Sequence, residues 1–220
     1  MKRLFDLVSS GILIIVVSPL LIPLMILLRL TGEGKIFYVQ QRIGKGQKLF
    51  GLLKFATMLE NSPNMAGGDV TSGKDPRVLP MGGFLRKSKI NELPQLLNIF
   101  LGQISVVGPR PMTPRNFEYY TDSVQKDIGS LKPGLTGIGS IVFRDEEGVL
   151  QRSDKPHLDC YREDIAPYKG ELEVWYKNHQ SFFLDLQLVF LTAWAIVAPK
   201  SELHFKLYKD LPKSELLQIG

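Results

Sequence analysis

The chain of 220 residues contains one cysteine, Cys160, and only three histidines. A single cysteine excludes an internal disulfide, so the fold does not require an oxidising compartment. His157 and His179 have no metal-ligand spacing to each other or to Cys160, which argues against a zinc site. The sequence also lacks a P-loop, a glycine-rich dinucleotide fingerprint, internal repeats and low-complexity segments. Disulfide-stapled, zinc-binding and repeat proteins are thereby excluded.

The length and charge limit the remaining classes. A chain of this length can form one compact domain with a membrane element, but it is too short for two full domains. Its formal net charge of +5 suits an anionic membrane surface, a pyrophosphate substrate or nucleic acid. The strongly apolar start of the chain argues against a nucleic-acid partner, because such a helix has no use on a duplex.

The segment from Leu7 to Leu30 is almost entirely apolar. It is long enough to cross roughly 30 Å of hydrocarbon, and too long for a cleaved signal peptide. Ser18-Pro19 lies near its centre, where proline removes a backbone donor and favours a bend or break. Basic residues flank both ends, which the positive-inside rule places in the cytoplasm. Two alternatives remain from the residues alone, a straight span and a re-entrant helix that breaks at Ser18-Pro19 and returns.

The rest of the chain predicts a mixed α/β fold, mostly helical. Two short strands are expected at 36–39 and 49–53 around a polar turn, followed by a loop from Glu60 to Gly83. Helical spacing predicts helices over 93–101, 116–128, 161–175 and 182–198, the first ending at Gly102. The last of these carries Asp185 as its only charge and is either a buried core helix or an amphipathic helix in the membrane interface. The tail from Ser201 is expected to be peripheral.

Basic side chains next to turns are the candidates for binding phosphate. Arg110 stands out, because Pro109 and Pro111 restrict the backbone around it and reduce the entropy lost when a guanidinium is aimed at a phosphate. The further candidates of this kind are Arg42, Lys54, Arg86 and Lys87.

The segment around Asn91 and Glu92 is the second focus. Asn91 occupies the expected N-cap of the helix over 93–101, and a helix N-terminus also favours phosphate. Glu92 either complements the helix dipole, acts as a catalytic carboxylate or binds a metal. Asp75 and the run from Asp145 to Glu147 are the other candidate carboxylates.

Taken together, these segments resemble the bacterial sugar transferase family, the monotopic polyprenyl-phosphate phosphoglycosyl transferases. The similarity covers nearly the whole chain up to about Pro199. The motifs that carry it are Lys2-Arg3-Leu4-Phe5-Asp6, Ser18-Pro19, Gln41-Arg42-Ile43-Gly44, Lys54-Phe55-Ala56-Thr57-Met58, Asp75-Pro76-Arg77-Val78, Leu85-Arg86-Lys87-Ser88, Asn91-Glu92-Leu93-Pro94, Val107-Gly108-Pro109-Arg110-Pro111, Lys132-Pro133-Gly134-Leu135-Thr136-Gly137 and Phe183-Leu184-Asp185-Leu186.

The resemblance implies a re-entrant membrane helix over residues 1–31, a small membrane-associated catalytic domain with interfacial helices over 32–200, and a C-terminal tail over 201–220. It implies Mg²⁺-dependent transfer of a sugar phosphate from a UDP-sugar to polyprenyl (undecaprenyl) phosphate, the first membrane step in assembling a bacterial glycan. The catalytic domain would lie on the cytoplasmic face of the inner membrane, with the bilayer as a partner, no nucleic acid, and a homodimer as an open possibility.

The chain departs from the family at its reactive centre. In the family an Asp-Glu pair is catalytic and the Asp attacks the β-phosphate, whereas this chain has Asn91 followed by Glu92. A neutral amide is a poor nucleophile and a poorer magnesium ligand than a carboxylate. Ala56 and Ile138-Gly139-Ser140 also differ from the family pattern. Two functions therefore stay open: an active transferase that uses another route, and a catalytically silent relative that binds lipid phosphate or sugar-assembly partners.

Overall fold

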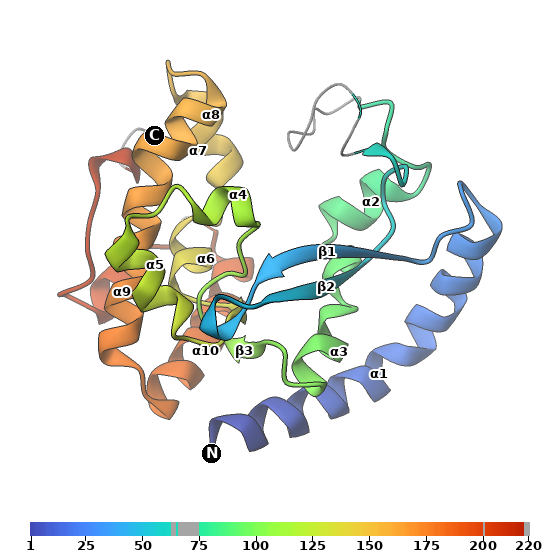
Figure 1. Cartoon of the computed structure of the whole chain (residues 1–220). Coiled ribbons are helices and arrows are strands. Elements are labelled where there is room, and N and C mark those ends of the chain that lie inside the picture. The colour runs from blue at the N-terminus through green and yellow to red at the C-terminus, as the bar shows by residue number, and fades with distance from the viewer. Residues whose placement is uncertain (63–64, 66–74, 200, 218–220) are drawn as a thin grey trace. The chain divides into compact units, whose positions relative to one another are not determined.

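The computed structural model describes residues 1–62, 65, 75–199 and 201–217. This part of the chain is mostly helical and contains two small sheets, as Figure 1 shows. The expectation of a mixed, mostly helical α/β fold is confirmed. Much of the loop predicted from Glu60 to Gly83, namely residues 63–64 and 66–74, lies outside the described residues.

The chain folds as two compact units. The N-terminal unit comprises Leu4–Gln41 and Gly51–Gly102, and the C-terminal unit comprises Met1–Arg3, Arg42–Phe50 and Gln103–Gly220. This grouping does not test the boundaries after residues 31 and 200, which stay predictions.

The N-terminal unit contains most of the long first helix and a small sheet. The pattern expected around the polar turn is confirmed, because strands β1 and β2 pair on either side of the 3-10 helix η1. The side chain of Asn98 fastens helix α3 to β2: its Nδ2 donates to Gly51 O at 2.8 Å, and its Oδ1 accepts from Leu53 N at 2.9 Å. The elements are α1 (Lys2–Leu30), β1 (Phe37–Ile43), β2 (Leu49–Phe55), α2 (Gly82–Lys87), η3 (Ile90–Glu92) and α3 (Gln95–Phe100). The 3-10 helix η1 (Lys45–Gln47) between the two strands belongs to the C-terminal unit, as do the adjoining ends of both strands.

Helix α1 runs through both of its prolines, so the break predicted at Ser18-Pro19 is wrong. The local chemistry explains why the helix survives. Pro19 has no N–H, so the carbonyl of Ile15 loses its usual helical donor. The hydroxyl of Ser18 donates to that same Ile15 O at 2.8 Å. A serine before the proline thus satisfies the carbonyl that the proline leaves open, and the helix continues as a curved rod (Figure 1).

The C-terminal unit has a two-stranded parallel sheet and a helical core. Strands β3 (Ser105–Val107) and β4 (Gly134–Thr136) pair in the register Ser105 with Gly134 and Val107 with Thr136. The helices are α4 (Pro114–Phe117), α5 (Asp122–Gly129), α6 (Ile138–Val142), α7 (Glu146–Arg152), α8 (His157–Cys160), the π-helix η4 (Tyr161–Ile165), α9 (Ala166–His179), α10 (Phe182–Val197), α11 (Leu203–Leu207) and the 3-10 helix η5 (Glu215–Leu217).

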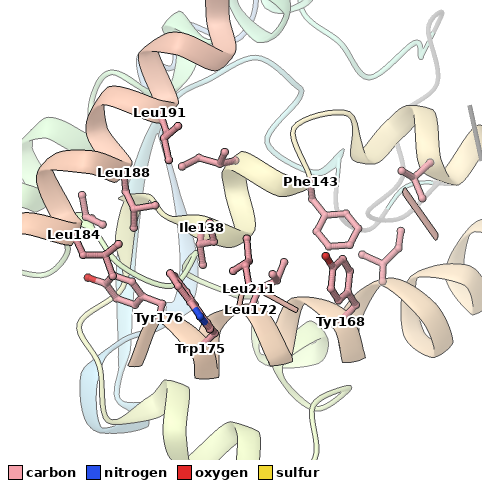
Figure 2. Packing of buried hydrophobic residues seen from close by; sticks show 14 of the residues in the cluster. Ile138, Phe143, Tyr168, Leu172, Trp175, Tyr176, Leu184, Leu188, Leu191 and Leu211 are labelled. Atoms are coloured by element: carbon pink, nitrogen blue, oxygen red, sulfur yellow. The ribbon is translucent and has the colours of Figure 1, made fainter. Parts of the chain in front are cut away.

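The core of this unit lies between α6, α9 and α10 (Figure 2). Leu172 and Tyr176 of α9 and Leu184, Leu188 and Leu191 of α10 are all buried in this core, together with Ile138 of α6. Burying a large apolar side chain stabilises a fold by about 1.5–3 kcal/mol, so this helix pair is a major source of stability.

Two polar features complete the C-terminal unit. Asp185, the lone charge of α10, is 2% exposed and pairs with Lys2 Nζ at 2.5 Å and with Tyr176 OH at 2.6 Å. The expectation of a peripheral tail is wrong for the segment after α10, because Leu211 is 3% exposed and belongs to the core. The tail returns to the core because it supplies an apolar side chain and hydrogen-bond partners for α9.

Candidate active site

Asn91 and Glu92 lie on η3, directly after α2. Lys89 separates the two helices with a φ of 61°, in the left-handed region that costs a non-glycine residue roughly 1 kcal/mol or more. That turn reverses the chain after α2 and starts η3 at Ile90. Backbone strain of this kind is common at functional sites, so the turn indicates that this segment is a candidate functional site.

Asn91 does not cap a helix, so the expectation that it is an N-cap is wrong. Helix α3 begins at Gln95 with Pro94 in the cap position. An N-cap side chain bonds the backbone N–H two or three residues on, and the third residue after Asn91 is Pro94, which has no N–H. Asn91 is instead 8% exposed, and its Oδ1 is buried without a hydrogen-bond partner among the described residues. The expected end of α3 is confirmed, since Gly102 follows it with a φ of 83°.

Three predicted phosphate ligands belong to the same unit as Asn91 and Glu92. Arg86 is half-buried on α2, with Nη1 2.9 Å from Met58 Sδ, while Lys87 is exposed at the end of that helix. Lys54 is half-buried on β2. The N-terminal unit therefore carries five of the seven predicted site residues, with Arg86 and Lys87 just before the Asn91-Glu92 pair.

Asp75 is a structural carboxylate. Its Oδ2 accepts from Arg77 Nη2 at 2.6 Å, and both side chains are buried, with exposures of 6% and 2%. The hydrogen bonds from Arg77, assisted by the charge of Arg86, lower the pKa of Asp75 to about 2. Arg77 Nη1 also donates to Ser62 O, so this ion pair fastens the chain segments around it.

Arg110 lies in the C-terminal unit, on a segment whose main chain is held at every residue. Gly108 N donates to Thr136 O and Pro109 O accepts from Gly134 N, at 2.9 and 2.8 Å. Arg110 N–H donates to the carboxylate of Glu173. The last two contacts of the segment are Pro111 O with Arg42 Nη1 at 3.0 Å and Met112 O with Ile43 N at 2.9 Å.

These contacts hold the backbone of residues 108–112 while the side chain of Arg110 stays exposed. Arg110 borders a shallow apolar crevice whose wall includes Ile43, Met112 and Phe117. An exposed guanidinium on a fixed backbone is well suited to bidentate binding of a phosphate. Arg42, also predicted to bind phosphate, contributes to this arrangement by supporting Pro111.

A buried charged cluster beside Arg110 was missed at the sequence level. Lys169 and Glu173 of α9 are 7% and 4% exposed, and Lys169 Nζ pairs with Glu146 Oε2 at 2.5 Å. Burial raises the pKa of Glu173 to about 7, against the opposing effects of the Arg110 N–H and of Lys169. The signal was available, because Lys169, Glu173 and buried Tyr176 share one face at spacings of four and three residues. Glu146, an outside candidate for catalysis, is occupied by this pairing.

Magnesium is the cofactor that the resemblance implies. No group of three or more His, Cys, Asp or Glu side chains that could hold a metal occurs among the described residues. Mg²⁺ commonly takes only one or two protein oxygens together with substrate phosphates. The buried, unpartnered Oδ1 of Asn91 and the half-buried carboxylate of Glu92 are oxygen donors that fit this demand.

Comparison with known proteins identifies relatives over nearly the whole chain. Residues 1–199 match the family described as "Bacterial sugar transferase". The exopolysaccharide production protein ExoY of Sinorhizobium fredii is 33% identical over 209 residues, which are 89% of this chain and 84% of the relative. The uncharacterized sugar transferase EpsL of Bacillus subtilis is 34% identical over 195 residues, 87% of this chain and 85% of the relative.

A longer relative is the UDP-glucose:undecaprenyl-phosphate glucose-1-phosphate transferase of Klebsiella pneumoniae. It is 32% identical over 198 residues, which are 88% of this chain but only 39% of the relative. The match through residue 199, together with identities above 30% to relatives of similar length, shows that the chain belongs to the bacterial sugar transferase family.

Proposed function

We propose that this chain transfers a sugar phosphate from a UDP-sugar to polyprenyl phosphate. The acceptor phosphate attacks the β-phosphorus of the donor, the bond between the two donor phosphates breaks, and UMP leaves. Family membership over residues 1–199 is the observation that carries this proposal. One relative is named for transfer of glucose 1-phosphate between UDP-glucose and undecaprenyl phosphate, which supports the substrate classes, and another is named for exopolysaccharide production, which supports a role in glycan assembly.

The acceptor requires the protein to work at a membrane surface, because its tail is lipid and its phosphate is not. Helix α1 is long and apolar enough to cross a membrane, and only 6% of its most apolar window is buried. Helix α10 buries Leu184, Leu188 and Leu191 on one face, while the other exposes an apolar stripe: Phe183, Leu186, Phe190, Trp194 and Val197. That stripe suits a helix lying in the interface.

A pocket in the N-terminal unit could take the first isoprene units of the acceptor. Its volume is about 140 Å³, and it is lined almost entirely by apolar side chains of α1, β1, β2 and the segment 93–97. Leu93 and Pro94 in its wall directly follow Glu92 in the sequence. A tail held there would leave its phosphate near the Asn91-Glu92 pair.

The re-entrant topology is supported by where the ends of α1 are attached. Lys2, at the start of the helix, binds Asp185 and Tyr176, and the chain rejoins the same unit at Arg42. If α1 crossed the bilayer, the short polar segment between Leu30 and Arg42 would have to cross back. Non-helical backbone exposed to lipid is very unfavourable. We therefore place both ends, and the catalytic domain, on the cytoplasmic face of the inner membrane.

Asn91 determines which chemical route is open. An amide cannot form the covalent sugar-phosphate intermediate, so the polyprenyl phosphate attacks the donor directly, with Glu92 as the general base or as the group that orients the acceptor. Lys54, Arg86 and Lys87, which belong to the same unit as Asn91 and Glu92, supply positive charge for phosphate. Arg110 of the C-terminal unit, whose neighbour Pro111 is held by Arg42, is a separate phosphate ligand. Bound Mg²⁺, held by Glu92 and the Asn91 oxygen, would supply charge neutralisation at the transferring phosphoryl group.

Product analysis tests this function. Full-length protein in detergent would be incubated with undecaprenyl phosphate, Mg²⁺ and each of a panel of radiolabelled UDP-sugars. We expect label to enter the lipid phase with at least one sugar, together with stoichiometric UMP. Glu92→Gln should abolish transfer, whereas Glu171→Gln, on the exposed face of α9, should not.

The second candidate, a catalytically silent relative, is favoured by Asn91 alone. It predicts binding of undecaprenyl phosphate without UMP release for every sugar in the panel. Restored turnover in Asn91→Asp alone would show that the site is otherwise competent and has lost its nucleophile.

A further inference from the structure

The main chain at Arg110 has one anchor that can change its charge. Four of the five contacts that hold residues 108–112 involve backbone partners or Arg42, whose charge is fixed at any working pH. The anchor at Arg110 itself is the carboxylate of Glu173. The neighbouring Gly108 packs backbone against backbone, since a Cβ there would lie 2.4 Å from Lys132 O.

The carboxylate of Glu173 packs against Gly139 of α6. A Cβ on Gly139 would lie 2.4 Å from Glu173 Oε1, closer than real side chains approach. Glu173 Oε2 is buried and has no hydrogen-bond partner among the described residues. A buried carboxylate that is only partly satisfied is costly, so a purely structural role would be better served by an amide or an apolar residue.

We propose that Glu173 is the positioning residue of Arg110: its carboxylate, seated over Gly139, holds the Arg110 main chain so that the guanidinium is presented to the donor phosphate. This inference rests on the proposed function for the role of Arg110, but the geometry on which it depends does not. The contact of Glu173 with this loop is to the Arg110 backbone, so its effect on phosphate binding is expected to pass through the position of Arg110.

The surroundings of Glu173 raise the pKa of its carboxyl group, so this group titrates near neutral pH. Its pKa of about 7 arises from burial and is limited by the Arg110 N–H and Lys169. The three nearby tyrosines have raised pKa values and remain neutral, and α6 contributes no titratable group. The charged and titratable groups around Glu173 are Arg110, Lys169 and Tyr176 on α9, Glu146 on α7, Tyr161 on η4, and Tyr120 after α4. Helix α5, which also packs on α9, contributes Asp127, and this carboxylate is paired with Lys177.

Hydrogen exchange tests the contact without requiring turnover. In residues 108–112 only Gly108, Arg110 and Met112 carry an amide hydrogen, because the other two are prolines. Glu173→Ala should raise exchange at Arg110 about tenfold or more while Gly108, bonded to Thr136, changes little. Glu173→Gln keeps an acceptor, so it should retain most of the protection and lose the change of protection across pH 7 seen in the unmodified protein. Glu171→Gln is the matched control on the same helix.

A pair of variants tests the packing of the Glu173 carboxylate against Gly139. Gly139→Ala should displace the carboxylate and raise exchange at Arg110 as Glu173→Ala does. Adding Glu173→Asp removes one methylene and should restore folding stability, because the shorter side chain withdraws from the new methyl group. If Gly139→Ala leaves both exchange and stability unchanged, Glu173 does not pack against Gly139 and the proposal is overturned.

Kinetics connect the contact to the reaction. With the donor identified by product analysis, Glu173→Ala should lower kcat/KM about tenfold, chiefly through KM, and should have no further effect in an Arg110→Ala background. Independent, additive losses would overturn the positioning role. If even the unmodified protein fails to transfer sugar phosphate, the proposed function fails, and exchange at Arg110 still decides whether Glu173 positions that residue.

Discussion

At the residue scale, Asn91 is the position where sequence and structure together change the mechanism. Its Oδ1 is buried and has no partner among the described residues, so it is available to a hydrogen-bond donor or a cation. An aspartate would place a second carboxylate there, directly before Glu92. That site would resemble the family's pair in charge as well as in position.

Asn91→Asp should therefore allow a covalent sugar-phosphate adduct after incubation with a UDP-sugar and Mg²⁺. The unmodified protein should show sequential kinetics and no adduct, since Glu92 is one position along and should not reach the same phosphorus in line. Intact-mass measurement of both proteins detects the added mass. An adduct on the unmodified protein would rule out direct attack.

Arg110→Lys should weaken donor binding although it preserves the net charge. Lysine keeps the positive charge but loses the planar fork that binds two phosphate oxygens. We expect kcat/KM to fall roughly tenfold to a hundredfold, the equivalent of a charge-assisted hydrogen bond of about 1.5–3 kcal/mol. Steady-state kinetics on a variant with unchanged melting temperature make the comparison. Normal turnover would mean that Arg110 only supports the loop.

The prominence of Arg110 could be predicted from its flanking prolines, but its anchor could not. Glu173 lies 63 positions later in a segment that the sequence predicts only as a helix. A contact between a side chain and a distant main-chain N–H leaves no local pattern. The failed N-cap at Asn91 differs, because Pro94 already removed one of the two N–H groups that such a cap could bond. The other, Leu93 N–H, donates to Ile90 O.

At the element scale, α1 shows how a helix tolerates proline within an apolar run. The sequence predicted the element and its approximate ends, since both follow from apolar length and flanking charge. It predicted a break where the structure has a continuous helix, because the Ser18 hydroxyl satisfies the carbonyl left by Pro19. A side-chain compensation of this kind depends on geometry and not on composition.

Cysteines at Ser9 and Thr31, in a Cys160→Ala background, should both be protected from an impermeant thiol reagent in intact cells. Protection follows if both ends of α1 are cytoplasmic. Pro19→Leu restores a backbone donor and straightens the helix, which should expose the first site to the outside in part of the population. Permeabilised cells serve as the control for reactivity. Labelling of Ser9→Cys alone without Pro19→Leu would establish a straight span.

At the scale of the whole molecule, the segment after α10 extends the core beyond the family match. Asp210 Oδ2 accepts from Trp175 Nε1 at 2.8 Å, Tyr208 packs on the same indole with ring centroids 5.1 Å apart, and Leu211 is buried. The segment lies outside the residues that match the family, so its packing was not part of the resemblance.

Truncation after Pro199 should consequently lower the melting temperature by about 10 °C. The loss combines one buried leucine with the Trp175 bond and the Tyr208 contact, together several kcal/mol, at roughly 2–4 °C per kcal/mol for a protein of this size. Thermal unfolding in detergent measures it, with Leu211→Ala as a smaller graded change. An unchanged melting temperature would return the tail to the peripheral role first expected.

Glu173 should make the whole fold less stable as pH rises. Its pKa is about 7 in the folded protein and near 4.5 when unfolded, so the folded state binds the extra proton between these values. The unfolding free energy should fall as pH rises from about 4.5 to 7, by up to about 3 kcal/mol. Glu173→Gln should flatten this slope in denaturant titrations at several pH values. If the unfolding free energy has the same pH dependence in the unmodified protein and in Glu173→Gln, the raised pKa of Glu173 is contradicted.

The bond between Lys2 and Asp185 has a consequence for how the chain is made. The two residues are 183 positions apart. At a synthesis rate of about 5–20 residues per second, Lys2 waits roughly 10–40 s for its partner to leave the ribosome. During that interval α1 can enter the bilayer with its starting end unattached, so its orientation becomes final only when α10 emerges. Synthesis of α10, the last helix within the residues that match the family, is thus the step after which the start of α1 can be fixed.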